Sequence, residues 1–348
     1  MTDSGKKPPL SHGPFNQSHR KSVGHLPLFD PNAGVVVAEP PGEGEGFWAG
    51  GPSAIFDAEK DRFLLSYRLR TQLRDHGRAG RGGETVVAES TDGSSGTAFK
   101  KIWSAPKEAF DALSIEKSCL MKDLEGRYRL YVSYSSVHDY RWRIDVMEAD
   151  SPEGFDPQRR VNVLSPENTG TEGVKDPVIF IVGGMWHLYA NMAPRPVTGD
   201  YARFDRMHKE GNAFVSGELA CPTGLATSAD GIQFNWQGQV IPCGQGWDRY
   251  MARISALVYT PPVFTAIYDG RPNSGANYAD RPGLAITTDL RTFHKLDHGH
   301  GLLSSPHGRG TLRYIDAVVL GKRLHYFYEM ARPDGAHELR TAVVELKA

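Results

Sequence analysis

The sequence of 348 residues predicts an all-β protein, a five-bladed β-propeller with four-stranded antiparallel blades. Three observations lead to this prediction: a hairpin pattern occurs five times, a turn-rich pattern follows its first four copies, and helical periodicity is almost absent. Units of four antiparallel strands that repeat at roughly 60 to 80 residues are typical of propeller blades. Two β-sandwich domains are the alternative, because they also have short, evenly spaced strands, but sandwiches do not require a fivefold repeat.

Each hairpin consists of an apolar run, a tight turn and a second run rich in aromatic residues. The five copies are residues 50–68, 116–135, 174–192, 252–270 and 313–330. The first strand of each copy is almost continuously apolar, as expected for a strand that is covered on both faces. We therefore expect these five strands to line a central channel.

The second pattern supplies the outer strands of each blade. It has Asp-Gly, Pro-Glu-Gly and Asp-Leu turns flanked by strand-like alternation, in residues 84–103, 143–164, 224–241 and 283–303. The last unit stops after about three strands. We therefore expect residues 33–40 to supply its fourth strand and close the ring, which would remove an exposed edge.

The rest of the composition restricts domains and partners. Residues 1–25 are polar and rich in proline, which predicts a disordered tail before a single domain of residues 26–348. With 40 basic and 41 acidic residues, the chain has no global field that favours nucleic acid or a membrane surface. It has neither a secretory apolar run nor a run long enough to span a membrane, so a cytoplasmic protein is expected. Its oligomeric state is left open.

The cysteines and histidines form no recognisable metal or redox motif in the sequence. The three cysteines have spacings that match no zinc or redox motif, and the 13 histidines show no His-Glu-x-x-His arrangement. Isolated residues of these types are more often structural than ligands. We therefore expect no cofactor and no metal, and a metal in the channel is the alternative.

The stretch "KDPVIF" at residues 175–180 and the outer hairpin "GLATSADGIQF", together with five blades, resemble the five-bladed propeller glycosidases and glycosidic phosphorylases. This group includes glycoside hydrolase families 32, 43, 62, 68, 117 and 130. The resemblance implies an enzyme that cleaves a glycosidic bond of a carbohydrate in the central funnel, where acidic residues of the inner strands converge. It also implies that Asp176 stabilises the oxocarbenium-like transition state.

Cleavage of a glycosidic bond also requires a group that protonates the leaving oxygen. The candidate carboxylates beside Asp176 are Glu116, Glu172, Asp248 and Asp316, and we favour Glu116 as the acid. Pro177 fixes φ and has no N–H, so it is expected at the beginning of a strand, where it would hold Asp176 at the rim. A turn cap is the alternative role for Asp176, and an ordinary surface ion pair is the alternative for Glu116.

The first hairpin departs from the family pattern, because "FWAGGPSAI" has no carboxylate aligned with Asp176. Either another blade supplies the missing group, or the acceptor is phosphate, or the propeller binds carbohydrate without catalysis. Cations favour an anionic substrate or phosphate. The candidate substrate-binding residues are Trp48, Lys117, Lys175, Arg253, Arg313 and Tyr314. The arginine-rich segment 66–84 is expected to form a loop at the rim.

Overall fold

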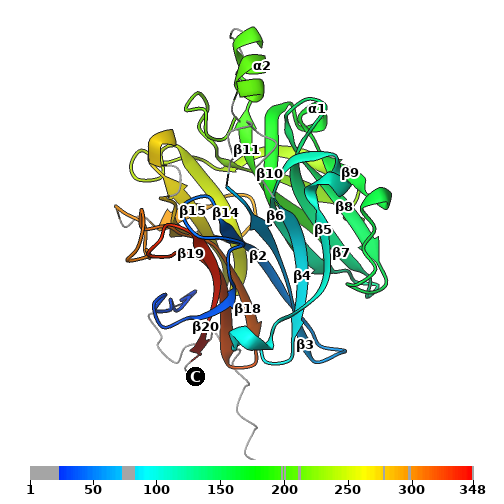
Figure 1. Cartoon of the computed structure of the whole chain (residues 1–348), viewed down its shortest axis with the longest axis vertical. Helices are drawn as coiled ribbons and strands as arrows, with labels where there is room; N and C mark the ends of the chain where they lie inside the picture. Colours follow the sequence, from blue (N-terminus) through cyan, green and yellow to red (C-terminus); the bar gives the residue numbers. More distant parts are fainter. Residues whose placement is uncertain are drawn as a thin grey trace, which may run out of the picture.

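The computed structural model describes residues 23–72, 83–196, 199, 201–210, 213–276, 279–296 and 299–346. These residues form an almost entirely β structure (Figure 1). Most of the predicted tail, residues 1–22, lies outside the described residues. None of the helices in the described part of the chain is long and apolar enough to cross a membrane.

Three sheets each contain four antiparallel strands in chain order. The first sheet consists of β6 (Ala112–Lys122), β7 (Tyr128–Ser136), β8 (Trp142–Ala149) and β9 (Val161–Leu164). The second consists of β10 (Thr171–Val182), β11 (Met185–Pro194), β12 (Thr223–Ser228) and β13 (Asn235–Ile241). The third consists of β14 (Met251–Thr260), β15 (Val263–Arg271), β16 (Arg281–Thr287) and β17 (His294–Leu296).

The remaining strands form one mixed sheet of eight. Its first half consists of β2 (Trp48–Asp57), β3 (Arg62–Arg70), β4 (Glu84–Ser90) and β5 (Lys100–Pro106). Its second half consists of β18 (Leu312–Leu320), β19 (Arg323–Ala331), β20 (His337–Glu345) and β1 (Val35–Ala38). A parallel pairing of Trp48 with His337 joins the halves, and β1 pairs antiparallel with β20, as expected for residues 33–40.

Five strands, each the first of its hairpin, lie at the middle of the molecule in Figure 1. They contact one another in the order β2, β6, β10, β14, β18, and β18 also contacts β2. The hydrophobic clusters lie between the faces of neighbouring sheets. For example, Tyr131 of β7 and Leu188 of β11 belong to one such cluster, and both are fully buried. This cyclic arrangement differs from that of two sandwiches.

Every one of these five inner strands has an irregularity at a similar position. Regular pairing is interrupted between residues 50 and 53, 115 and 118, 175 and 178, 254 and 256, and 313 and 316. Bulges of this kind bend a strand and redirect its side chains. Asp176 and Tyr314 sit in two of these bulges with φ of 58° and 53°, a conformation that is uncommon for residues with a Cβ.

The expectation that Pro177 begins a strand is therefore wrong. Asp176 and Pro177 lie well inside β10, in its bulge. A bulge tolerates proline because the residue there does not need to donate a ladder hydrogen bond.

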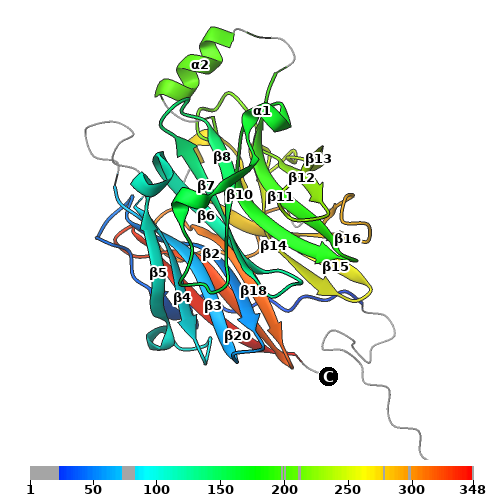
Figure 2. The same cartoon turned by 90° about the vertical axis from the view of Figure 1, so that its right-hand side faces the viewer.

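The expectation of almost no helix misses one element. Helix α2 (Tyr201–Glu210) lies in the connection between β11 and β12, and α1 (Pro166–Thr169) is a single turn before β10. Among the described residues, 3₁₀ turns occupy Gly96–Ala98, Lys107–Phe110, Pro157–Arg159 and Ser274–Ala276. In Figures 1 and 2, α2 projects from the end of the molecule where β10 begins.

Candidate functional site

A network of charged side chains surrounds the bulges of the inner strands, and we call it the funnel cluster. All its members are less than a tenth exposed, and they include six cations and five carboxylates. They are Arg68, Arg70, Glu116, Lys175, Asp176, Arg253, Asp269, Arg271, Asp280, Arg313, Tyr314 and Glu329. A charge of either sign is costly to bury unless it is paired. The gathering of this many ionic groups in one place therefore indicates a site rather than ordinary strand packing.

The hydroxyl of Tyr314 lies at the centre of the funnel cluster. It is 3.3 Å from Oδ2 of Asp176 and 3.4 Å from Oε2 of Glu116. Since both oxygens contact the same hydroxyl, the distance between Oδ2 of Asp176 and Oε2 of Glu116 is less than twice 3.4 Å. Retaining glycosidases place their two carboxyl groups about 5–5.5 Å apart, and inverting enzymes about 6.5–9.5 Å apart. This upper limit on the distance between the two carboxylate oxygens allows the whole range of the retaining enzymes. It allows only the lower edge of the range of the inverting enzymes.

Arg253 holds both Tyr314 and Asp176. Its guanidinium carbon is 3.6 Å from the centroid of the Tyr314 ring, and its Nη1 donates to Oδ2 of Asp176 at 3.3 Å. Its Nη2 donates to Oδ2 of Asp269 at 2.7 Å. Arg253 is therefore occupied on every side by groups of the cluster.

Glu116 is paired with arginine in the same way. Nε of Arg68 donates to its Oε2 at 2.8 Å, and Nη1 of Arg70 donates to its Oε1. Burial acts to raise the pKa of Glu116, but Arg70 and Arg68 outweigh burial and hold the pKa well below its ordinary value. Glu116 is therefore ionised in this arrangement.

Lys175 differs from the other cations of the cluster. Its Nζ lies 3.6 Å from Oδ2 of Asp176 and 5.0 Å from the ring centroids of both Trp142 and Phe214. It makes no hydrogen bond with any residue that the structure describes. Oδ1 of Asp176 is likewise buried without a hydrogen-bond partner among the described residues.

The sequence interpretation missed the charges that the second strand of each hairpin contributes. The ladders place Arg68 opposite Gly50, Asp269 opposite Arg253, and Glu329 opposite Arg313. All three second-strand residues directly follow a tyrosine in the repeated aromatic run. A tyrosine followed by a charged residue, repeated in three hairpins, was the sequence signal that could have revealed these charges.

Part of the predicted rim loop belongs instead to the site. Arg68 and Arg70 lie at the carboxyl end of β3, and both are buried in the funnel cluster. They were expected in a loop because glycines follow them closely in the sequence. Arg74, Arg78 and Arg81 of that segment lie outside the described residues.

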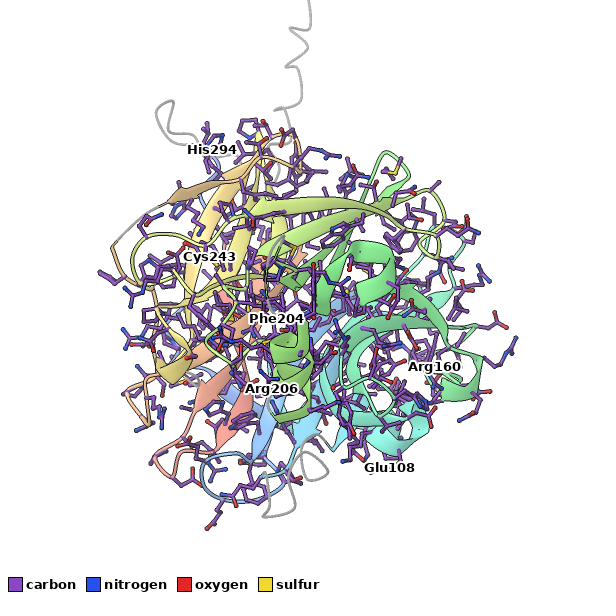
Figure 3. All side chains as sticks on the ribbon, turned by 90° about the horizontal axis from the view of Figure 1, so that it is seen from above. Glu108, Arg160, Phe204, Arg206, Cys243 and His294 are labelled. Carbon is purple, nitrogen blue, oxygen red and sulfur yellow. The ribbon has the colours of Figure 1, made fainter. Side chains whose placement is uncertain are left out.

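Two of the candidate acids lie apart from the cluster. Glu172 accepts from Nη1 of Arg141 at 2.5 Å and Nε of Arg195 at 2.7 Å, and its Oε2 is 2.9 Å from Nε2 of His208 on α2. Asp248 is bound by Lys295 at 2.5 Å and belongs to the loop before β14. The view from above places α2, with Phe204 and Arg206, near the middle of this end of the molecule (Figure 3).

Lys117 and Asp316 lie on the other side of the bulges. They line a cavity of about 310 Å³ to which all five inner strands contribute. Nζ of Lys117 donates to the carbonyl of Pro177 at 3.3 Å, and Oδ2 of Asp316 accepts from the backbone N–H of Ala54 at 2.8 Å. Burial raises the pKa of Asp316. These two residues are thus separated from Tyr314 by the strands themselves.

Trp48 joins the cluster as a packing surface. Its ring stacks on His337 at 5.2 Å and lies near the guanidinium groups of Arg70 and Arg313, at 4.6 and 5.0 Å. Only 1% of Trp48 is exposed, so in this arrangement cations cover the face that was expected to meet a sugar.

Comparisons with known proteins agree with this architecture. No family model and no curated protein matches the sequence. The chain is similar in structure to a β-1,2-mannobiose phosphorylase from Listeria innocua, with a TM-score of 0.61 and 13% identity over 90% of this chain and 94% of the other. It is also similar to RS223 β-xylosidase, with a TM-score of 0.62 and 15% identity over 90% and 95% of the two chains.

A third similar structure is the α-L-arabinofuranosidase from Lactobacillus brevis, with a TM-score of 0.60 and 11% identity over 85% of this chain and 90% of the other. Identities this low reveal a shared fold and leave the substrate open. The chain therefore has the β-propeller-like fold of structures described as glycosidases and a glycosidic phosphorylase.

Proposed function

We propose that the protein is a five-bladed propeller enzyme that hydrolyses a glycosidic bond of a carbohydrate at the funnel cluster. The blade count is supported by the three four-stranded sheets and by the two halves of the mixed sheet, whose inner strands contact one another in a cycle. In the second half of that sheet, β1 completes the set of four strands by pairing with β20.

One observation carries the proposal: Glu116 and Asp176, from different sheets, meet at the same tyrosine hydroxyl. Bond cleavage passes through a state with positive charge on the sugar ring, which ionised carboxylates stabilise. Asp176 is suited to this role because its Oδ1 is buried and has no protein partner among the described residues. Glu116, which two arginines keep ionised, is suited to act as a base or as a second stabiliser rather than as an acid.

Phosphorolysis is the second candidate, and the excess of cations over carboxylates in the funnel cluster favours it. Guanidinium and ammonium groups bind phosphate through charge-assisted hydrogen bonds. A phosphorylase would also need no water-activating base.

The test is a screen of 4-nitrophenyl glycosides and oligosaccharides, with and without inorganic phosphate, on the wild-type chain and on Asp176→Asn. We expect the variant to lose a factor on the order of 10²–10³ in kcat, comparable to the loss of one preorganised stabilising group. Binding of the substrate, measured by calorimetry, should persist. Asp92→Asn, in an exposed turn, is the control and should retain full activity. A wild-type chain that binds sugars but turns over none of them would support a carbohydrate-binding propeller instead.

A further inference from the structure

Hydrolysis in the funnel requires a proton donor, and the carboxylates of the cluster are poorly placed for this task. Arginines keep Glu116 ionised, as described above. Burial acts to raise the pKa of Glu329 and of Asp280, but neighbouring arginines hold both below their ordinary values. Each of these three groups therefore lacks the proton that it would have to donate.

Asp269 is the exception among them, because burial raises its pKa. It is 0% exposed, however, and its Oδ2 accepts from both Arg253 at 2.7 Å and the backbone N–H of Tyr314 at 3.0 Å. Its Oδ1 has no hydrogen-bond partner among the described residues but is itself buried, so the surrounding side chains separate this carboxyl from a substrate. Asp269 is therefore a structural partner of Arg253.

Lys175 has the geometry that these carboxylates lack. It is 7% exposed, more than any other charged residue of the cluster, and its ammonium makes no hydrogen bond with the described residues. It is next to Asp176 in sequence, and its Nζ is 3.6 Å from Oδ2 of that carboxylate. The rings of Trp142 and Phe214, each 5.0 Å from Nζ, limit hydration of the ammonium.

We propose that Lys175 is the proton donor to the leaving-group oxygen, an assignment that rests on the hydrolytic function proposed above. A proton moves from Nζ to the glycosidic oxygen as the bond between that oxygen and the anomeric carbon breaks. The products of this step are an alcohol, a neutral amine and a sugar cation beside Asp176. Water then attacks the anomeric carbon, and the proton that the water loses restores the ammonium.

The electrostatics of the site agree with this assignment. Burial lowers the pKa of Lys175 from its ordinary value, against the opposing effects of Asp176 and Glu116. A general acid works best when its pKa lies near the working pH, and burial is the usual way in which a lysine approaches that value. The simpler alternative is that Lys175 only neutralises Asp176.

The test uses Lys175→Arg and Lys175→Met with a series of glycosides of the hydrolysed sugar, from methyl through 4-nitrophenyl to 2,4-dinitrophenyl. Arginine keeps the positive charge but does not release a proton at ordinary pH. We expect both variants to lose at least 100-fold in kcat/KM on the methyl glycoside and less than about fivefold on the dinitrophenyl glycoside, whose leaving group needs no protonation. The fall in wild-type activity at high pH should disappear with the latter substrate.

Lys122→Arg is the matched control, because Lys122 also pairs with an aspartate, Asp57 at 2.8 Å, beside a tyrosine ring. It should be fully active on every substrate. Equal losses along the series, or full activity of Lys175→Arg, would overturn the assignment while leaving the hydrolytic function standing. A wild-type chain without hydrolytic activity would instead overturn the function.

If neither Lys175 variant folds, the temperature dependence of the wild-type alkaline limb decides the question. Ionisation of an ammonium has a large enthalpy, whereas ionisation of a carboxylic acid has an enthalpy near zero. A limb whose midpoint moves strongly with temperature supports Lys175, and a stationary midpoint assigns the proton to a carboxylic acid.

Discussion

The tyrosine hydroxyl between two carboxylates is the residue-scale feature on which the proposed chemistry depends. A hydroxyl has one proton, so Tyr314 can satisfy Glu116 or Asp176 fully, but not both at once. Burial raises the pKa of Tyr314 well above its ordinary value, so the hydroxyl stays protonated. Tyr314 therefore serves as a donor that orients the two carboxylates.

Tyr314→Phe removes this donor and leaves the ring that packs on Arg253. We expect kcat to fall by about 10- to 100-fold, which corresponds to the ~1.5–3 kcal/mol of a hydrogen bond to a charged group. Steady-state kinetics and thermal melting should be measured together. The control is Tyr134→Phe, which removes a buried hydroxyl 2.8 Å from Asp145 outside the cluster. It should lower the melting temperature and leave kcat unchanged, and a similar fall in kcat in both variants would contradict the role of Tyr314.

The sequence pointed to part of this site and missed the rest for identifiable reasons. Asp176, Lys175, Glu116, Arg253 and Tyr314 were found because each lies near the apolar core of a repeated inner strand. Their mutual contacts were not predictable, since a shift of one residue at a bulge moves a side chain to the other face of a strand. Such a shift separates Lys117 from its neighbour Glu116, and places it in the cavity below the bulges.

At the scale of elements, the repeated hairpins were predictable from alternation and turn residues, whereas the bulges were not. Gly51 in the bulge of β2 has a φ of 63°, similar to the φ of Asp176 in the bulge of β10 and of Tyr314 in the bulge of β18. A Cβ at Gly51 would lie 3.2 Å from Cα of Lys117. The close approach of two inner strands therefore leaves little room for a carboxylate side chain at this position of the first hairpin.

Helix α2 was missed because its ten residues are the only substantial helical segment in the described chain. Phe204, Met207 and His208 form its buried face. The helix is held to β10 through the contact of His208 with Glu172. Phe204 and Met207 also attach the helix through apolar packing, so only the contribution of the Glu172 contact should depend on pH.

Glu172→Gln tests this dependence. Burial acts to raise the pKa of Glu172, but His208, Arg195 and Arg141 lower it from 4.5 to about 2. Because the folded-state pKa is below the unfolded value, the ionised group contributes stability that is present above about pH 4.5 and is lost as the pH falls toward 2. We expect calorimetric melting temperatures of the wild type and the variant to differ at pH 7 and to converge near pH 2. Glu125→Gln, at an exposed position, should follow the wild type throughout; a constant difference for Glu172→Gln would disprove the linkage.

At the scale of the whole molecule, the segment that precedes β1 is part of the core. The ring of Phe29 lies 4.6 Å from the rings of both Tyr326 and Tyr328 on β19, and Phe29 is 6% exposed. The beginning of the described chain is thus packed against its last hairpin. The cyclic order of the sheets was predictable from the repeat, but this packing was not, because residues 1–25 and their neighbours carry no periodic pattern.

Phe29→Ala should therefore destabilise the entire fold by about 3–5 kcal/mol, as expected for removing a buried phenyl ring. Denaturant unfolding should show one transition whose midpoint moves without a change in slope. Leu28→Ala, at a position that is 38% exposed, is the control and should cost much less. A separate early transition in Phe29→Ala would mean that the last hairpin unfolds independently of the other sheets.

The pairing of β1 with β20 also has a consequence for how the chain assembles. Val35 pairs with Thr341, so the contact joins residues about 300 positions apart. Contacts this distant in sequence slow folding, and β1 has to wait without its partner until the last hairpin is available. During that interval, β1 of one molecule and β20 of another present complementary edges. Refolding at high concentration is therefore the condition under which two chains would exchange this strand and form a swapped dimer.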